Sequence, residues 1–199
     1  IKEYKKDAGI KFAFLMGPTS PKVPFARQIG VLHAVSGVER IPDTKAWDPK
    51  AITATKEIWE KEGIKWTVVE GPPSLGTQTK LGLAGRDEEI SNFITFMKNL
   101  KQYGDVDVIC YNWMPVISWA RTQTDRPGRG GALMTAFDYE DMKGKPLTQY
   151  GEISKELLWK NLEYFLKAVA PEAEKIGMNL SLHPDDPQVD SIQGISRIM

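Results

Sequence analysis

The chain has 199 residues, 41% of them hydrophobic and 26% charged, which is the composition of an ordinary soluble globular protein with enough material for a sizeable core. Its 26 basic and 26 acidic residues balance to a net charge of zero, so no basic excess favours nucleic acid as a partner. The single cysteine, Cys110, excludes an internal disulfide framework, and no apolar run reaches the roughly 18 residues of a membrane span, so we expect a cytoplasmic protein without a membrane partner.

Strand-like and helix-like patterns alternate in the first part of the chain. An apolar run at residues 11–16 predicts a strand, residues 25–29 predict a short helix, and residues 31–35 predict a second strand. An aspartate followed by a proline is typical of a helix start and predicts a helix at residues 48–62. The apolar run at residues 64–70 predicts a third strand.

The second part of the chain continues this alternation. An acidic first turn and apolar residues at helical spacing predict a helix at residues 87–100. Residues 106–111 predict a fourth strand that is covered on both faces, and residues 112–151 predict a long loop. A helix is expected at residues 155–171, where its last proline kinks or restarts it, and residues 179–183 predict a fifth strand.

Five strands separated by helices predict an α/β fold with a parallel sheet. No dinucleotide or phosphate-binding motif follows the first strand, whereas informative polar residues follow the third, fourth and fifth strands. That distribution favours a TIM (β/α)8 barrel, in which the carboxyl ends of all strands face one pocket. A complete barrel takes about 250 residues.

We therefore expect an incomplete TIM barrel with about five β/α units, in which residues 1–199 are a single catalytic-domain fragment. The chain starts at Ile1 rather than at a methionine and stops at Met199 directly after a strand-and-turn pattern, which agrees with a fragment. Open sheet edges promote pairing between chains, so we expect the isolated chain to be marginally stable or associated.

The most informative segment is Leu180–Pro187, in which a strand ends at His183 and two aspartates, Asp185 and Asp186, follow between prolines. α/β proteins place metal ligands and catalytic groups at such strand ends. The alternative is a histidine that only hydrogen-bonds its own turn. A histidine with oxygen ligands suits Mn²⁺, Fe²⁺ or Mg²⁺ better than a structural zinc site.

Polar and aromatic residues also follow the fourth strand. Asn112 and Arg121 offer hydrogen-bond donors for hydroxyl and carboxylate oxygens, while Trp113 and Trp119 offer flat apolar faces, a combination suited to a sugar or sugar acid. The alternative is core tryptophans with an ion pair from Arg121 to Asp125.

Two further residues are expected to be structural. Cys110 lies inside an apolar strand and is interpreted as a packing residue. His33 is interpreted as a core histidine whose hydrogen bonds are satisfied.

Five segments together resemble the D-mannonate dehydratase family of metal-dependent, xylose-isomerase-like TIM barrels. They cover the chain from about residue 10 onward in the expected order, and they are Leu81–Asp87, Cys110–Val116, Arg129–Asp138, Trp159–Leu166 and Leu182–Pro187.

The resemblance implies a carbon–oxygen lyase that dehydrates D-mannonate to 2-keto-3-deoxy-D-gluconate in hexuronate (glucuronate) catabolism, with Mn²⁺ or Fe²⁺ as cofactor. It implies His183 as a metal ligand and Asn112, Trp113 and Arg121 as substrate-pocket residues. Asp185 or Asp186 is expected to orient His183 from behind. The general base and acid stay unassigned.

The family's other metal ligands lie beyond the end of this chain, and Cys110 does not replace the family's cysteine ligand because it belongs to a different strand. Two alternatives remain open at this point: another divalent-metal-dependent sugar isomerase or epimerase, and a catalytically inactive fragment that binds sugar acids. The sequence also leaves open whether the protein forms a homo-oligomer.

Overall fold

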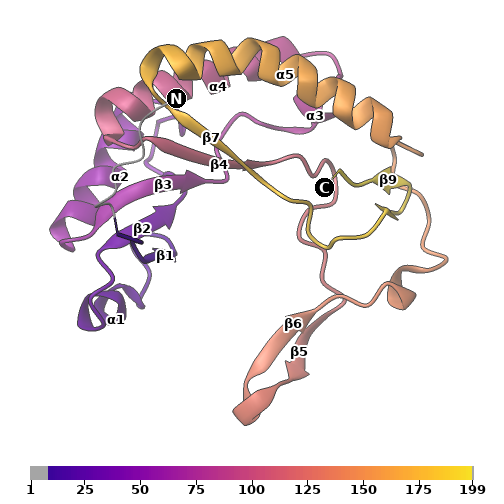
Figure 1. Cartoon of the computed structure of the whole chain (residues 1–199), viewed down its shortest axis with the longest axis horizontal. Helices are drawn as coiled ribbons and strands as arrows, with labels where there is room; N and C mark the ends of the chain where they lie inside the picture. The colour runs from indigo at the N-terminus through magenta and orange to yellow at the C-terminus, as the bar shows by residue number, and fades with distance from the viewer. Residues whose placement is uncertain (1–8, 199) are drawn as a thin grey trace. The chain divides into compact units, whose positions relative to one another are not determined.

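The computed structural model describes residues 9–198, and Figure 1 shows its elements along the chain. These residues divide into two compact units. The first contains residues up to Pro73, Phe93–Cys110 and Ala173–Ser181, and the second contains Ser74–Asn92, Tyr111–Glu172 and the residues from Leu182 onward. A single catalytic-domain fragment over residues 1–199 stays a prediction.

The main element is a five-stranded sheet in the order β1-β2-β3-β4-β7. The pairs β1 with β2, β2 with β3 and β3 with β4 are parallel. The predicted parallel α/β arrangement is therefore confirmed, with strand boundaries that differ from the prediction by at most two residues. The strands are β1 (Ala13–Leu15), β2 (His33–Ser36), β3 (Lys65–Glu70), β4 (Val108–Asn112) and β7 (Asn179–His183).

The four predicted helices are present, because each places apolar residues at helical spacing and so buries one face. Phe93, Met97 and Leu100 of the third of them are fully buried, as are Leu158 and Phe165 of the last. The helices are α1 (Val23–Gln28), α2 (Pro49–Lys61), α4 (Arg86–Asn99), which continues into the π-helical turn Leu100–Gly104, and α5 (Lys155–Ile176). None of the helices within residues 9–198 has a stretch long and apolar enough to cross a bilayer.

Two elements of the second unit were not expected from the sequence. A short helix, α3 (Thr77–Leu81), precedes α4 and was not predicted. The predicted long loop contains an antiparallel hairpin, β5 (Gln123–Pro127) and β6 (Leu133–Ala136). Its residues are almost all exposed, so the burial pattern that marks a strand in a sequence is missing.

The helix α5 continues through Pro171 to Ile176, so it does not restart there, and a kink at this residue stays a prediction. Proline removes one backbone hydrogen bond, and the long apolar face of α5 keeps the helix together on both sides of it. After β7 the chain forms a second small hairpin, β8 (Ser191–Ile192) and β9 (Ile195–Ser196).

The sheet buries alternate side chains instead of both faces. In β4, Ile109 and Tyr111 are buried while Val108, Cys110 and Asn112 are partly exposed. At the edge strand β1, the apolar residues Phe12, just before the strand, and Leu15, its last residue, are exposed. The prediction that β4 is covered on both faces is therefore wrong for residues 9–198. The association expected for this chain from its open sheet edges stays a prediction.

The interpretation of His33 as a satisfied core histidine is also wrong. The residue is half-buried at the start of β2, and its Nδ1 atom has no hydrogen-bond partner within residues 9–198. By contrast, the indole N–H groups of Trp59 and Trp66 both donate to Ser36, to its hydroxyl at 3.1 Å and its carbonyl at 3.3 Å.

Candidate functional site

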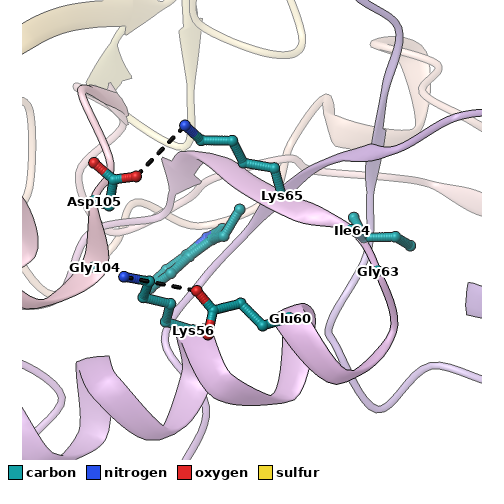
Figure 2. Close-up of a pocket in the computed structure, with 8 residues that line it drawn as sticks. Lys56, Glu60, Gly63, Ile64, Lys65, Gly104 and Asp105 are labelled. Carbon is teal, nitrogen blue, oxygen red and sulfur yellow. Dashed lines mark ion pairs between the residues drawn. The ribbon is translucent and has the colours of Figure 1, made fainter.

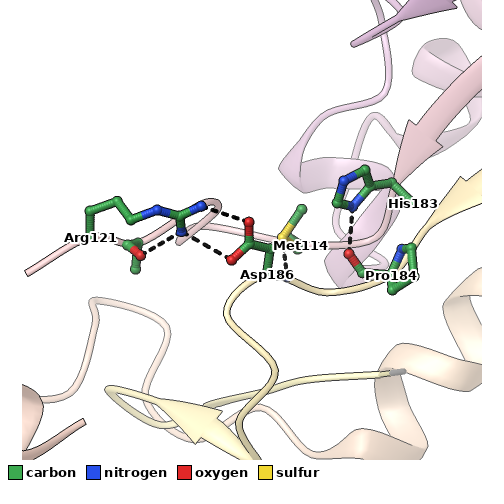
Figure 3. A network of polar contacts seen from close by, with 6 residues as sticks. Met114, Arg121, His183, Pro184 and Asp186 are labelled. Carbon is green, nitrogen blue, oxygen red and sulfur yellow. Dashed lines mark hydrogen bonds and ion pairs between the residues drawn. The ribbon is translucent and has the colours of Figure 1, made fainter. Parts of the chain in front are cut away.

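The imidazole of His183 is held at the end of β7 by its own turn. Its Nδ1 atom lies 2.6 Å from the carbonyl oxygen of Pro184, as Figure 3 shows. A carbonyl only accepts hydrogen bonds, so Nδ1 carries a proton, and in the neutral ring Nε2 keeps its lone pair. The ring makes a T-shaped contact with Trp119, with ring centroids 6.0 Å apart. Metal-ligating histidines commonly donate their second ring N–H to a backbone carbonyl in this way.

Arg121 and Asp186 form a bidentate ion pair across 65 residues of sequence. The two guanidinium nitrogens Nη1 and Nη2 lie 3.0 and 2.7 Å from the two carboxylate oxygens (Figure 3). Arg121 also donates to the carbonyl of Ala120. The hydrogen bond from Arg121 lowers the pKa of Asp186. The sequence offered Asp125 as a partner for Arg121. In the structure the partner is Asp186, which follows β7.

Asp185 points into the protein, and its side chain is 1% exposed. Its carboxylate accepts the backbone N–H of Ile198 at 2.8 Å. Burial raises the pKa of Asp185, against the opposing effects of that N–H and of the positive charges of Arg197 and Lys80. The hydrogen bonds of Asp185 and Asp186 go to Ile198 and Arg121, so the group that orients His183 is the Pro184 carbonyl instead of a carboxylate.

Arg197 follows β9 and is fully buried, although no site role was predicted for it. None of its three side-chain nitrogens has a hydrogen-bond partner within residues 9–198. Burial lowers the pKa of Arg197, and the negative charges of Asp185 and Asp186 oppose this effect. The positive charge of the guanidinium therefore offsets the negative charge of the buried Asp185 carboxylate, without a hydrogen bond between them.

The side-chain oxygen of Asn112 accepts two hydrogen bonds at the end of β4. The donors are the ammonium of Lys80 at 2.8 Å and the backbone N–H of Met114 at 3.1 Å. Lys80 lies on α3 and is only 7% exposed. The prediction missed it because α3 is too short for a periodic pattern, and the glycines on either side, Gly76 and Gly82, are its one sequence signal.

Burial lowers the pKa of Lys80 to about 8, with the charges of Asp185 and Glu89 opposing the shift. Between about pH 8 and 10.5 the unfolded chain binds a proton that the folded chain lacks, so folding stability rises with pH. Relative to a Lys80→Met variant, the natural protein should gain about 3 kcal/mol of unfolding free energy across this range and lose it again as the pH falls to 8. Urea denaturation of both proteins at pH 8 and 10.5 measures this difference, and a constant difference contradicts it.

The structure places Trp113 in the core of the second unit instead of at a pocket surface. The residue is 0% exposed, its indole N–H donates to the carbonyl of Leu158 at 3.1 Å, and its ring packs on Phe165. Trp119, which is 39% exposed beside His183, is the tryptophan of this region that offers a free face.

Cys110 and Glu70 belong to neighbouring strands in the first unit. Burial raises the pKa of the Cys110 thiol, and the negative charge of Glu70 raises it further. A protonated, partly buried thiol is a poor nucleophile and a poor metal ligand, which supports the interpretation of Cys110 as a packing residue.

A cavity of about 310 Å³ lies in the first unit at the amino ends of β3 and β4 (Figure 2). Its charged side chains pair with one another, Lys56 with Glu60 at 3.7 Å and Lys65 with Asp105 at 3.5 Å. Asn112, by contrast, stands at the carboxyl end of β4. Active sites of parallel barrels form at the carboxyl ends of strands, so we do not assign the candidate site to this cavity.

A divalent metal ion needs more ligands than the described residues bring together. Within residues 9–198 no group of three or more histidine, cysteine, aspartate or glutamate side chains is arranged to hold an ion. His183 offers one nitrogen, while the carboxylates of Asp185 and Asp186 are engaged elsewhere. This part of the chain therefore does not form a complete metal site.

Comparison with known proteins shows the family to which the chain belongs. A family model described as D-mannonate dehydratase (UxuA) matches residues 16–148 and 144–199. A mannonate dehydratase from Streptococcus uberis is 34% identical, with 87% of this chain and 56% of that protein covered. One from Oceanobacillus iheyensis is 35% identical, with 84% and 54% covered. The chain thus spans about half the length of the curated relatives that it matches.

Solved structures give the same result. The crystal structure of mannonate dehydratase from Streptococcus suis serotype 2 superimposes with a TM-score of 0.84 at 33% identity, covering 96% of this chain and 58% of that one. A D-psicose 3-epimerase from Clostridium cellulolyticum H10 superimposes with a TM-score of 0.52 at 14% identity, covering 92% and 56%, which shows the fold alone. The predicted incomplete, xylose-isomerase-like TIM barrel is confirmed. The chain belongs to the D-mannonate dehydratase (UxuA) family.

Proposed function

We propose that the protein containing this chain dehydrates D-mannonate to 2-keto-3-deoxy-D-gluconate, as a carbon–oxygen lyase of hexuronate (glucuronate) catabolism. The observation that carries the proposal is that Asn112 and His183 are the last residues of β4 and β7 and that Arg121 lies in the loop after β4, in a chain of this family. We also propose a cytoplasmic location and a small sugar acid as the binding partner.

The reaction removes a proton from C2 and a hydroxide from C3, which together leave as water, and the resulting enol tautomerises to the keto acid. Negative charge accumulates on the substrate carboxylate as C2 is deprotonated, so donors that face this charge lower the barrier. Arg121 is the proposed donor to the substrate oxygens, because a guanidinium holds five N–H groups and Asp186 occupies two of its nitrogens. The amide nitrogen of Asn112 is the second proposed donor.

His183 is the proposed metal ligand of this chain, through the free lone pair of Nε2. A bound Mn²⁺ or Fe²⁺ would supply Lewis-acid stabilisation of the charge on the substrate. Residues 9–198 bring together no complete set of metal ligands, so the remaining ligands would have to come from other residues of the protein. For the same reason we propose that the 199 residues alone do not turn over substrate.

Product analysis tests the proposed reaction. The protein produced from its complete gene, supplied with Mn²⁺ or Fe²⁺, is expected to consume D-mannonate and form a keto-deoxy acid, which is followed by its reaction with thiobarbituric acid after periodate oxidation. The 199-residue chain serves as the matched inactive sample. Exchange between an aldose and a ketose without loss of water would instead assign the protein to the isomerases.

A further inference from the structure

The two hydrogen bonds to the oxygen of Asn112 determine which way its amide faces. Lys80 Nζ and Met114 N are both donors and neither can accept, so the amide oxygen must face them. The NH₂ group of Asn112 then lies on the opposite side of the amide. Asn112 is partly exposed at the carboxyl end of β4, so this group is the part of the side chain that a bound molecule meets.

The ammonium of Lys80 is itself held from several sides. It lies 2.8 Å from the Asn112 oxygen and 3.5 Å from the carbonyl of Met114. The backbone carbonyl of Lys80 accepts the side-chain N–H of Asn161 at 3.1 Å. With 7% of its surface exposed, the side chain has no alternative position in solvent.

The helix that carries Lys80 is fixed by a carboxylate at its amino end. One oxygen of Glu89, on α4, accepts the backbone N–H groups of Gly76 and Thr79 at 3.2 and 2.9 Å and the hydroxyl of Thr79 at 2.7 Å. These bonds satisfy amide groups that a helix start leaves unpaired. They connect α4 to α3, and through Lys80 to Asn112.

We propose that Lys80 is a positioning residue of the dehydration reaction, which acts by holding Asn112 with its NH₂ group toward the oxygens of the sugar acid. This inference rests on the proposed function, because it takes a sugar acid as the molecule that Asn112 meets. Lys80 itself does not touch the reacting atoms, since its ammonium is directed at Asn112 and Met114. Without it, the amide keeps a single hydrogen bond, from Met114, and rotates more freely.

A double-mutant cycle separates this role from a direct one. In the protein produced from its complete gene, Lys80→Met is expected to lower kcat/KM for D-mannonate by about 10- to 100-fold, the effect of losing a hydrogen bond to a charged group. In an Asn112→Ala background the same change should cost less than about threefold, because the group that Lys80 positions is gone. Equal losses in both backgrounds would overturn the proposal.

Two variants control for folding and charge. Lys80→Arg keeps the donors and the charge, so its kcat/KM should lie between those of the natural protein and Lys80→Met, and a value as low as that of Lys80→Met counts against the positioning role. Lys160→Met removes an exposed lysine of α5 and should leave kcat/KM unchanged. Thermal melting of each variant confirms that it is folded.

A measurement without turnover keeps this inference distinct from the proposed function. In ¹⁵N-labelled protein, the side-chain NH₂ resonances of Asn112 are identified as the pair that Asn112→Ala removes. Lys80→Met should shift this pair and Lys160→Met should not. An unshifted pair overturns the positioning role, whereas a shifted pair in a protein that does not consume D-mannonate contradicts only the proposed reaction.

Discussion

Replacing His183 with alanine in the protein produced from its complete gene is expected to abolish stoichiometric metal binding and to reduce turnover of D-mannonate by several orders of magnitude. The His183 ring is oriented by the Pro184 carbonyl, which leaves Nε2 free as a ligand. Loss of a group that merely orients a ligand costs about 10- to 100-fold in metal affinity, and loss of the ligand itself should cost more. Metal content after dialysis, measured by mass spectrometry, and kcat measured on the same samples check this result.

The natural control is His33, the other histidine of the chain. It lies at the start of β2, at the opposite strand end from His183, and its Nδ1 atom has no partner within residues 9–198. His33→Ala should therefore keep the metal content of the unmodified protein. If His183→Ala also keeps it, His183 is not a ligand and the metal site lies elsewhere in the protein.

Replacing Trp113 with alanine should destabilise the protein by about 3–5 kcal/mol, as for other fully buried large aromatic residues. The substitution removes a 0% exposed ring from its contact with Phe165 and leaves the carbonyl of Leu158 without its indole donor. Urea denaturation followed by circular dichroism measures the loss. A change in substrate affinity with unaltered stability would return Trp113 to the substrate pocket.

Trp119 provides the matched comparison. Its side chain is 39% exposed, so Trp119→Ala should change the free energy of unfolding by less than about 1 kcal/mol. Because its ring makes a T-shaped contact with His183, the same change should lower kcat/KM for the sugar acid. The two variants thus separate a tryptophan that stabilises the core from one beside the proposed site.

Much of the fold was predictable because it depends on short-range patterns. The parallel strands β2, β3 and β4 are short apolar runs, and α4 and α5 place apolar residues at helical spacing, which a sequence displays directly. The hairpin β5–β6 was missed because its side chains are exposed and carry no such pattern. The helix α3 was missed because five residues are too few to show a period.

The candidate site was predictable only in part. His183 and Asn112 stand at strand ends and Arg121 follows in the loop after β4, and this position, their hydrogen-bonding groups and the family resemblance marked them. Their partners were not predictable, because Arg121 pairs with Asp186 over 65 residues and Lys80 reaches Asn112 over 32. No local spacing encodes such contacts.

By itself the sequence determined the order of strands and helices, the family resemblance and the strand end at which His183 stands. Tertiary structure alone decided which of the marked residues face solvent and which donors they meet. It buried Trp113, Asp185 and Arg197, and it placed a lysine against Asn112. The physical reason is that burial and hydrogen bonding depend on segments far apart in the chain, whereas propensity and periodicity depend on neighbours.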